Sequence, residues 1–455
     1  MTLSIYDTLS RTVKALSSTK SITSMYCCGP TVYRDAHVGN LRTFILSDLI
    51  RRTIEISGGT VRLIQNITDV GHMSEDVVGE DKMLSQAAAE KKDPFDIARM
   101  YEARFHKDLG LLNVIVADEY PRASESIDLM ITMITDLIAK GFAYVGSDNS
   151  IYFDAQAFES YGQISGNRLD ALKPGHRYEY SDEGGKRFHA DWALWKSAGP
   201  RTEMVWDSPW GTGFPGWHIE CSAMSMEFLN NHVDLHVGGI DLRFPHHENE
   251  RAQSNASIDS ETVDLWVHGE HLLFEGRKMS KSSGNVVLLS DVIARGLDPL
   301  ALRLCFLENR FRAQMDLTWE SIESADTTLS KWRKKMAQWG DSPKKLVDQE
   351  FLNSLEKDLD TPRALQRIRA VEKTDEISDA DKRAIFMYAD EVLALNLSRR
   401  EISKNISVEQ ERLLSARLTA RKEKRWGDSD ALRAELESTG LEINDSADGQ
   451  EWSWR

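Results

Sequence analysis

The pattern of apolar and polar positions near the N-terminus predicts a strand, a loop, a helix and a second strand. Residues 23–28 (TSMYCC) form a short apolar run typical of a buried strand, and residues 29–39 contain the Gly, Pro and Asp of a loop. From Asn40 the apolar positions recur at spacings of three and four, which indicates a helix, and the run 61–67 (VRLIQNI) follows as a strand. This order predicts a βαβ unit in a parallel sheet, whose ligands bind at the carboxyl ends of the strands, beside the first loop.

The rest of the chain changes character three times. Residues 128–202, rich in Gly, Asp, Ser and Tyr, predict an insertion between two halves of the sheet, and residues 235–239 and 264–268 have the pattern of strands that return to it. After about residue 323 the strand signal disappears, and amphipathic helical patterns run from 324 to 396. A linker-like stretch then precedes a last small unit with one clear helix, 411–439.

Composition restricts the class of protein. With 455 residues, 41% hydrophobic and 28% charged, the chain has the size of about two to four globular domains. No apolar run is long enough to span a membrane, and residues 1–18 lack the pattern of a signal peptide, so we expect a cytoplasmic protein with no membrane partner. Four cysteines are too few for a disulfide framework in a chain of this length, which leaves metal binding or simple burial.

The net charge of −16 argues against a nucleic-acid partner, because binding to a phosphate backbone requires a basic surface. Basic residues do cluster at 331–345 and 417–425. These stretches either form a local binding surface or are solvated helix faces, and charge alone favours the second interpretation.

The tetrapeptide His37-Val38-Gly39-Asn40 lies where the first loop ends and the helix begins. A helix N-terminus presents free N–H groups and the positive end of the helix dipole, which suits a phosphate. Gly39 permits close approach to the backbone, and His37 can donate a hydrogen bond to phosphate oxygens. A capped helix with a bystander histidine is the alternative.

Residues 278–282 read Lys-Met-Ser-Lys-Ser (KMSKS) and are followed by Ser-Gly-Asn. Two lysines among small hydroxyl residues and a glycine indicate a mobile cationic loop. Such a loop can close over a triphosphate and neutralise charge in the transition state. An exposed basic turn is the alternative, but the specificity of the string favours Lys278 and Lys281 as catalytic cations.

Three distant segments supply thiols, imidazoles and carboxylates. Cys28 ends the first predicted strand, Cys221 ends the segment GWHIEC, and residues 244–250 read FPHHENE. Two thiolates, one imidazole and one carboxylate form a suitable tetrahedral set for zinc. A buried cysteine pair next to a capped, charged helix is the alternative.

The helical spacing in the third segment leaves the choice of histidine open. Pro245 suits the start of a helix, on which His246 and Glu250 lie at i and i+4 and share a face. His247 and Glu250, at i and i+3, also share a face.

HVGN and KMSKS, in this order, resemble the two signatures of class I aminoacyl-tRNA synthetases, with HVGN in the place of HIGH. The change puts Asn40 where the family has its final histidine and shifts phosphate contacts toward His37. Further segments are similar to cysteinyl-tRNA synthetases: CGPTVY at 28–33, NITD at 66–69, GWHIECSAM at 216–224, FPHHENERAQS at 244–254, DTPRAL at 360–365 and DALR at 430–433. The resemblance covers nearly the whole chain.

The resemblance implies a fold, a set of domains and a set of partners. The fold is α/β: a Rossmann-like parallel-sheet catalytic domain with an insertion, followed by an all-α helical domain and a small C-terminal domain. The implied partners are tRNA-Cys, L-cysteine and ATP with Mg²⁺, and the family resemblance favours a monomer. The expected boundaries are 1–127 and 203–265 for the catalytic domain, 128–202 for the insertion, 266–322 for the stem-contact region with KMSKS, 323–405 for the helical bundle and 406–455 for the anticodon-binding domain.

The resemblance also implies the site residues. One zinc ion per chain is held by Cys28, Cys221, His246 and Glu250. Zinc prefers a soft thiolate to a hydroxyl, so it separates cysteine from the nearly isosteric serine without an editing site. The expected contacts of the amino acid are Gly29, Thr31, Thr68, Trp217 and His236, and those of ATP are His37, Gly39, Asn40, Asp241 and Lys281.

Each weaker assignment has a structural alternative. Trp217 is otherwise an ordinary core aromatic, Thr68 a strand-end residue and Asp241 a residue that stabilises a turn. Cys27 and Cys305 are assigned to structure.

The implied reaction has two steps, activation of cysteine as an adenylate and its transfer to the 2′-hydroxyl of the terminal adenosine of tRNA. His37, Asn40, Lys278 and Lys281 are its expected catalytic residues. A related ligase that joins cysteine to an amino sugar is one alternative, although it lacks the C-terminal domains. A non-charging paralogue is another, and neither a KMSKS lysine nor a zinc ligand is missing here.

Overall fold

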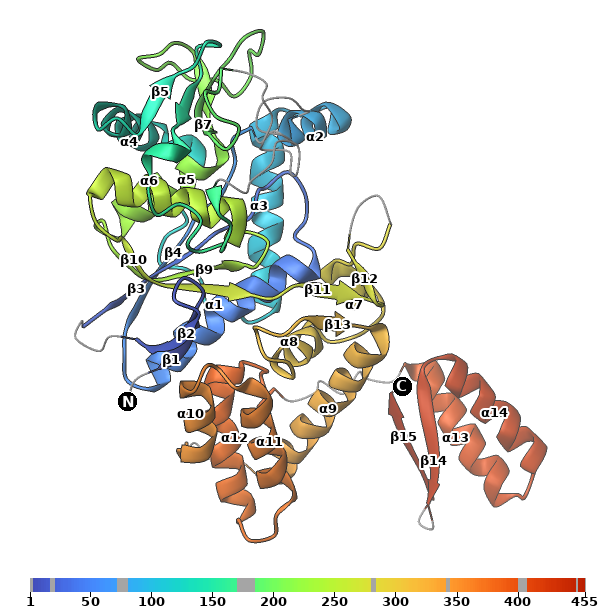
Figure 1. The fold of residues 1–455 in the computed structure, drawn as a ribbon. Coiled ribbons are helices and arrows are strands. Elements are labelled where there is room, and N and C mark those ends of the chain that lie inside the picture. The colour runs from blue at the N-terminus through green and yellow to red at the C-terminus, as the bar shows by residue number, and fades with distance from the viewer. Residues whose placement is uncertain are drawn as a thin grey trace. The chain divides into compact units, whose positions relative to one another are not determined.

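The computed structural model describes residues 3–16, 21–71, 81–169, 185–279, 284–340, 344–399, 407–446 and 449–454. By their contacts these residues divide into two compact units, Met1–Ser398 and Arg399–Arg455. Figure 1 shows both, and each is described by itself. Among the described residues, every helix is too short or too polar to cross a bilayer.

The first unit is built on a four-stranded sheet in which all strands are parallel. Its order is β10-β9-β3-β4, and α1 connects β3 to β4 while α6 connects β9 to β10. The predicted βαβ unit, the two returning strands and the α/β fold class are confirmed. The bounds are β3 Thr23–Cys27, α1 Val38–Ile56, β4 Val61–Gln65, β9 Val233–Gly239, α6 Glu248–Ile258 and β10 Val263–Gly269.

The two faces of this sheet are covered by different helices. In Figure 1, α1 lies on one face, and α6 with α5 (Trp217–Phe228) lies on the other. Successive side chains of a strand point to opposite faces, so Met25 and Cys27 pack into the core on the α1 side. Tyr26 and Cys28 point into the core formed with α5 and α6. Two adjacent cysteines therefore have different environments, and Cys27 is a core residue.

An insertion separates the two halves of the sheet. It contains a four-stranded antiparallel sheet with the order β5-β6-β7-β8, which reaches Pro215 because β8 pairs with β7. The expected end at 202 thus lies before the last strand of the insertion. The bounds are α4 Ile127–Ala139, β5 Ala143–Val145, β6 Ile151–Phe153, η2 Ala155–Ala157, β7 Trp192–Ser197 and β8 Gly213–Pro215. Before it come α2 Lys82–Glu90, α3 Pro94–Leu111 and η1 Ala123–Glu125.

The segment after β10 forms a small sheet and two helices. β11 pairs with both β12 and β13. The expected border between residues 265 and 266 falls inside β10, which continues to Gly269. The bounds are β11 Leu272–Phe274, β12 Arg277–Lys278, α7 Leu289–Ala294, α8 Pro299–Leu307 and β13 Met315–Leu317.

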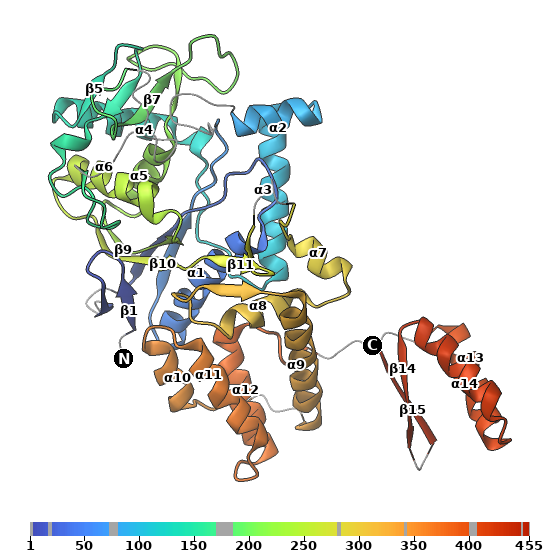
Figure 2. The ribbon, with the colours of Figure 1, turned by 45° about the vertical axis from the view of Figure 1, so that its right-hand side comes forward.

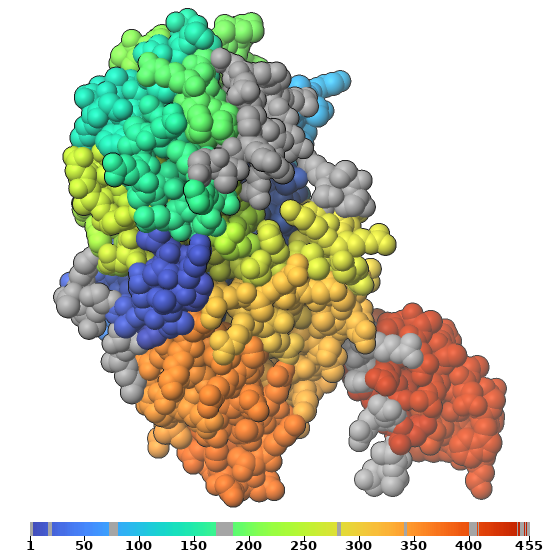
Figure 3. All heavy atoms as spheres, viewed as in Figure 1, coloured from blue at the N-terminus to red at the C-terminus, as the bar shows by residue number. Residues whose placement is uncertain are grey.

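In the described part of the predicted helical region there are four helices, which share one hydrophobic core with the parallel sheet. Their bounds are α9 Trp319–Gln338, α10 Gln349–Glu356, α11 Thr361–Lys373 and α12 Asp379–Leu393. An N-terminal hairpin, β1 Ser4–Asp7 with β2 Thr12–Ala15, lies between this region and the insertion on the face shown in Figure 3. The backbone N–H of Tyr6 donates to Asp358 (2.9 Å) and so attaches the hairpin to the helical region.

In the second unit two predictions are wrong. The single helix expected over 411–439 is two helices, α13 Val408–Lys422 and α14 Trp426–Ser438, because the chain turns at Lys424, whose φ is +58°. The strand signal does not end at 323, since β14 Leu441–Ser446 and β15 Gly449–Trp454 form an antiparallel hairpin. Arg417 donates to Asp445 in this hairpin, so part of the basic stretch 417–425 is used within the unit.

Candidate active site

A cavity of about 380 Å³ lies at the carboxyl ends of all four parallel strands of the first unit. Gly29 follows β3, Asn66 follows β4, Gly239 ends β9 and Glu270 follows β10, and all four line it. α1 begins at its floor, with His37, Gly39 and Asn40 in the lining. The cavity therefore lies where a doubly wound sheet binds its ligands.

The wall next to β3 and β4 requires a glycine. A side chain at Gly29 would place its Cβ 1.6 Å from the carbonyl oxygen of Asn66. The two residues are also joined by a hydrogen bond of 2.7 Å from the Gly29 N–H to the Asn66 side-chain oxygen. Thr31 and Thr68 form a bridge next to them, and the Thr68 hydroxyl donates to buried Glu220 (2.8 Å). The wall is thus fixed by main-chain contact and by a chain of hydrogen bonds.

His37 is the N-cap of α1. Its Nδ1 accepts a hydrogen bond from the backbone N–H of Asn40 (3.2 Å), and the Asn40 side chain accepts one from the N–H of His37 (3.2 Å). Because Nδ1 is an acceptor, the ring proton lies on Nε2, which can donate to a ligand. Burial and the charge of Arg34 lower the pKa of His37 and favour this neutral form.

The other predicted nucleotide contacts lie around the same opening. Asp241 lines the cavity and its charge acts on His37. Lys278, at the end of β12, also lines it and is exposed. Lys281 is outside the described residues. Arg34 and Lys82 add two lining cations that the sequence analysis missed.

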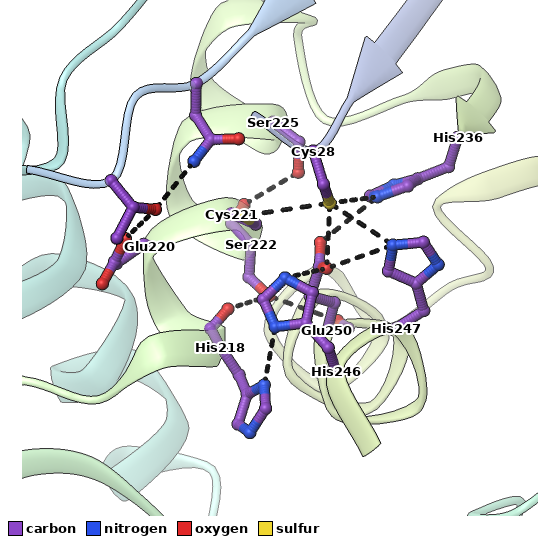
Figure 4. Close-up of polar contacts among 12 residues, drawn as sticks. Cys28, His218, Glu220, Cys221, Ser222, Ser225, His236, His246, His247 and Glu250 are labelled. Carbon is purple, nitrogen blue, oxygen red and sulfur yellow. Dashed lines mark hydrogen bonds and ion pairs between the residues drawn. The ribbon is translucent and has the colours of Figure 1, made fainter. Parts of the chain in front are cut away.

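Cys28, Cys221 and His246 in the cavity wall belong to a buried cluster of metal-ligand side chains, drawn in Figure 4. The Sγ of Cys28 lies 4.0 Å from that of Cys221 and 3.6 Å from Glu250 Oε1. His246 Nε2 is 2.9 Å from Glu250 Oε1, one helical turn apart as predicted. One ligand atom from each of these four residues lies within 4.8 Å of all the others, and all four residues are buried.

A second set in the same cluster shares Cys28 and Glu250 but takes His236 and His247 as its imidazoles. His236 Nε2 and His247 Nε2 lie 3.4 and 3.3 Å from the Cys28 sulfur. The sequence analysis placed His236 beside the substrate, whereas the structure buries it in this cluster. Each of the two candidate histidines has its other ring nitrogen next to a further imidazole: His246 next to His218 (2.9 Å) and His247 next to His268 (2.8 Å).

The electrostatics of the cluster favour a cation. Burial opposes a charged imidazole, yet Glu250 and Cys221 raise the pKa of His246 to about 10. Burial raises the pKa of the Cys28 thiol, with Cys221 and Glu250 adding to the effect. Glu250 Oε2 and His236 Nδ1 are buried and, within the described part of the chain, make no hydrogen bond. Unpaired lone pairs and a proton held on His246 are what a site for a positive ion shows without one.

The structure brings most predicted residues together. Trp217 lines the cavity and stacks on His246, with ring centroids 4.2 Å apart. His218 was not predicted, although its position three residues before Cys221 on one helix face is a usable signal. The predicted residues that line the cavity are Cys28, Gly29, Thr31, His37, Gly39, Asn40, Thr68, Trp217, Cys221, Asp241, His246 and Lys278.

Comparisons with known proteins agree with this geometry. The family described as "tRNA synthetases class I (C) catalytic domain" matches residues 14–327, and the "Cysteinyl-tRNA ligase anticodon binding domain" matches residues 404–452. A cysteine--tRNA ligase of Thermus thermophilus is 38% identical, with 99% of each chain covered. Cysteine--tRNA ligase 1 of Burkholderia lata is 39% identical over 99% of this chain and 96% of its own. The chain belongs to the cysteine--tRNA ligase family.

The fold of this cysteine--tRNA ligase family member is also that of a solved class I relative. Mycobacterium tuberculosis methionyl-tRNA synthetase, in complex with methionyl-adenylate, superposes with a TM-score of 0.56 at 15% identity. The match covers 83% of this chain and 90% of the other. At this identity the likeness concerns the fold alone.

Proposed function

We propose that the protein is a cysteine--tRNA ligase, which activates L-cysteine with ATP and transfers it to tRNA-Cys. The observation that supports this most strongly is the buried thiol-containing cluster directly beneath a cavity that also borders both nucleotide-binding motifs. The full-length similarity to cysteine--tRNA ligases supports the same reaction. The match of the last 50 or so residues to an anticodon-binding domain argues against an amino-sugar acceptor.

We infer that the cluster holds one zinc ion through Cys28, Cys221, His246 and Glu250. Two thiols in the set favour zinc over magnesium or calcium, which prefer oxygen ligands. The residues fit the ion because their ligand atoms lie within 4.8 Å of one another and Glu250 Oε2 has no other hydrogen-bond partner in the described chain. When bound, zinc supplies a soft Lewis acid that binds the substrate thiolate more strongly than a hydroxyl.

The residues of the chain then orient cysteine for attack. The rigid wall of Gly29, Thr31 and Thr68 faces the amino and carboxyl groups of the amino acid, and Trp217 closes the opposite side. This arrangement directs the cysteine carboxylate toward the α-phosphate of ATP–Mg²⁺. Attack forms cysteinyl-adenylate and releases pyrophosphate, and the rate gain comes mainly from positioning and electrostatics.

The nucleotide end stabilises the charge that develops on the phosphates. His37 donates from Nε2 to a phosphate oxygen, with Asn40 fixing the orientation of its ring through the capping hydrogen bonds. Lys278, which lines the cavity, and Lys281, which the KMSKS resemblance implies, neutralise charge on the phosphates. Gly39 and Asp241, in the same lining, contact the nucleoside. The 2′-hydroxyl of the terminal adenosine of tRNA then attacks the adenylate, and AMP leaves.

The test is cysteine-dependent exchange between ATP and pyrophosphate, followed by charging of bulk tRNA in the same preparation. We expect exchange with cysteine, at least about 10²-fold less with serine, and labelled tRNA. Exchange without labelled tRNA would move the acceptor to a small amine. Absence of exchange in zinc-supplied protein would reject the proposal. The monomeric state and the cytoplasmic location stay predictions, the first of which light scattering would test.

A further inference from the structure

Arg42 is a buried cation that the reaction scheme does not use. It lies on α1, two residues after Asn40, with only 6% of its surface exposed. Its guanidinium donates to four backbone carbonyls, those of Glu270 (2.8 Å), His271 (3.2 Å), Arg310 (3.2 Å) and Ala313 (3.0 Å). Among the described residues no carboxylate forms an ion pair with it. Burial accordingly lowers the pKa of Arg42 to about 10, even though the charge of Glu270 acts to raise it.

The carbonyl groups that bind Arg42 belong to segments that position the lysine motif. Glu270 and His271 connect β10 to β11, and both line the active-site cavity. β11 pairs with β12, with Leu273 opposite Lys278, so the position of Lys278 depends on where β11 begins. The other two carbonyls precede β13, which pairs with β11 on its other edge. Figure 2 shows β11 passing next to α1.

The segment after KMSKS is attached to the same helix. The backbone N–H of Val38 donates to the carbonyl of Val287 (3.0 Å), and His37 forms a bridge with Leu288. The first turns of α1 therefore hold the chain on both sides of the lysine motif. On the side that leads into the motif, the side-chain hydrogen bonds between the described residues of α1 and this segment come from Arg42.

We propose that Arg42 is a positioning residue, which sets the distance between His37 on α1 and Lys278 on β12 and so orders the two nucleotide-binding motifs relative to each other. The inference rests on the proposed function. It requires that loss of the four hydrogen bonds acts on the ATP half of the site. The cysteine half is built from β3, β4, α5 and α6 and makes none of these contacts.

The experiment compares Arg42→Met, Arg42→Lys and a matched control, Arg383→Met. Arg383 on α12 is also a buried arginine, and it donates to the carbonyl of Met336, far along the chain from the motifs. Each full-length protein is assayed for cysteine-dependent ATP–pyrophosphate exchange, with kcat and KM determined separately for ATP and for cysteine. Zinc content and thermal unfolding are measured on the same samples.

We expect Arg42→Met to lower kcat/KM for ATP by on the order of 10²-fold, because small displacements of reacting groups carry costs of that size. KM for cysteine and the zinc content stay at the wild-type values. Arg42→Lys keeps the charge and some of the donors, so it recovers part of the loss. Arg383→Met lowers the unfolding temperature without changing the kinetic constants of the folded enzyme.

Two results would overturn the inference. One is an Arg42→Met enzyme whose constants for ATP match those of Arg383→Met, which would make Arg42 a purely structural residue. The other is an equal loss in the constants for ATP and cysteine. Failure of the proposed function is distinguishable from both, because the wild-type protein itself would then show no cysteine-dependent exchange.

Discussion

Two buried polar clusters of the first unit differ in how completely their groups are paired. Asp48 on α1 accepts hydrogen bonds from Arg303 on α8, from Arg52 (2.8 Å) and from the backbone N–H of Ile115 (2.8 Å). Arg303 also donates to the carbonyls of Leu393 (2.7 Å) and Leu112 (3.1 Å). In the metal-ligand cluster, by contrast, thiols, imidazoles and a carboxylate face one another.

The difference separates a structural role from a functional one. Asp48 and Arg303 combine opposite charges with donors for every acceptor, so the pair needs nothing further and joins α1 to the helical region. The cluster around Cys28 consists mainly of electron-pair donors, among which Glu250 and Cys221 hold a proton on the buried His246 imidazole. Buried electron-pair donors repel one another unless a bound cation lies between them. Substitutions in either cluster should therefore have opposite effects on activity and on stability.

Replacing one ligand of the cluster should abolish activation and leave the fold intact. In Cys221→Ser the hydroxyl is a poor zinc ligand, so we expect loss of bound zinc and a fall in cysteine-dependent exchange of more than about 10²-fold, since even residues that only support a metal ligand cost 10–100-fold. Zinc analysis and exchange kinetics measure this. Cys305→Ser, at a buried thiol outside the cluster, serves as the control and should keep its zinc. Retention of full activity by Cys221→Ser would remove Cys221 from the ligand set.

Breaking the paired cluster should lower the stability of the fold and leave the activity of the folded protein intact. Arg303→Met leaves Asp48 buried with fewer donors, and we expect the free energy of unfolding to fall by about 3–5 kcal/mol. The kinetic constants of the folded fraction should not change. Urea unfolding measures the first quantity and exchange kinetics the second. The double variant Asp48→Leu/Arg303→Met should be more stable than the sum of the single effects requires. Strict additivity would show that the pair is not coupled.

The wall of the cavity lies between these extremes, because its hydrogen bonds are neutral and complete. Thr68→Val removes the donor to Glu220 and leaves that carboxyl buried without this partner. We expect KM for cysteine to rise by on the order of 10-fold, the equivalent of one lost buried hydrogen bond, while KM for ATP stays constant. Thr68→Ser retains the hydroxyl and should behave as wild type. A rise in KM with Thr68→Ser and none with Thr68→Val would assign the role to the methyl group.

The smallest effect concerns a buried carboxylate whose lysine partners reach solvent. Burial raises the pKa of Glu372, but hydrogen bonds from Lys331, Trp332 and Lys335 outweigh it and bring the pKa to about 2. Because this value is below the ordinary 4.5, the stabilisation is present above pH 4.5 and is lost as the pH falls toward 2. Glu372→Gln should cost about 1 kcal/mol near pH 7, since the partly exposed lysines are screened by solvent. Unfolding at pH 7 and at pH 3 should show the difference between the two proteins shrinking in acid.

Sequence reasoning succeeded where the signal was local and failed where partners are distant. The strand before Gly29 and the helix after His37 follow from periodicity. Helical spacing put both His246 and His247 on a face with Glu250, and only the resemblance chose His246. The hairpin 441–454 was missed because its strands are largely polar. The break was missed because the residue that turns the chain, Lys424, is neither a glycine nor a proline. The position of His236 in the metal-ligand cluster was not predicted, because Cys28 and Glu250 are distant from it in sequence and come close only in the folded chain.

Arg42 shows the same limit from another side. An arginine near the start of an amphipathic helix is ordinary in a sequence, and its four carbonyl partners lie more than 200 residues away along the chain. Backbone carbonyls have no sequence signature, so a side chain that binds only carbonyls is not recognisable before the fold is known. The resemblance to a family identified the two motifs. It did not identify the residues that position them relative to each other.

The close contact between Gly29 and Asn66 has a consequence for how the central strand pairs during folding. If β3 slipped by one residue against β4, Cys27 would take the position of Cys28. The cluster would then still contain two thiols, although the strand would be misaligned. The same slip would move Cys28 to the position of Gly29, where a Cβ lies 1.6 Å from a carbonyl oxygen. Gly29 thus disfavours this one-residue slip of β3, because the slipped strand would put a side chain against the Asn66 carbonyl.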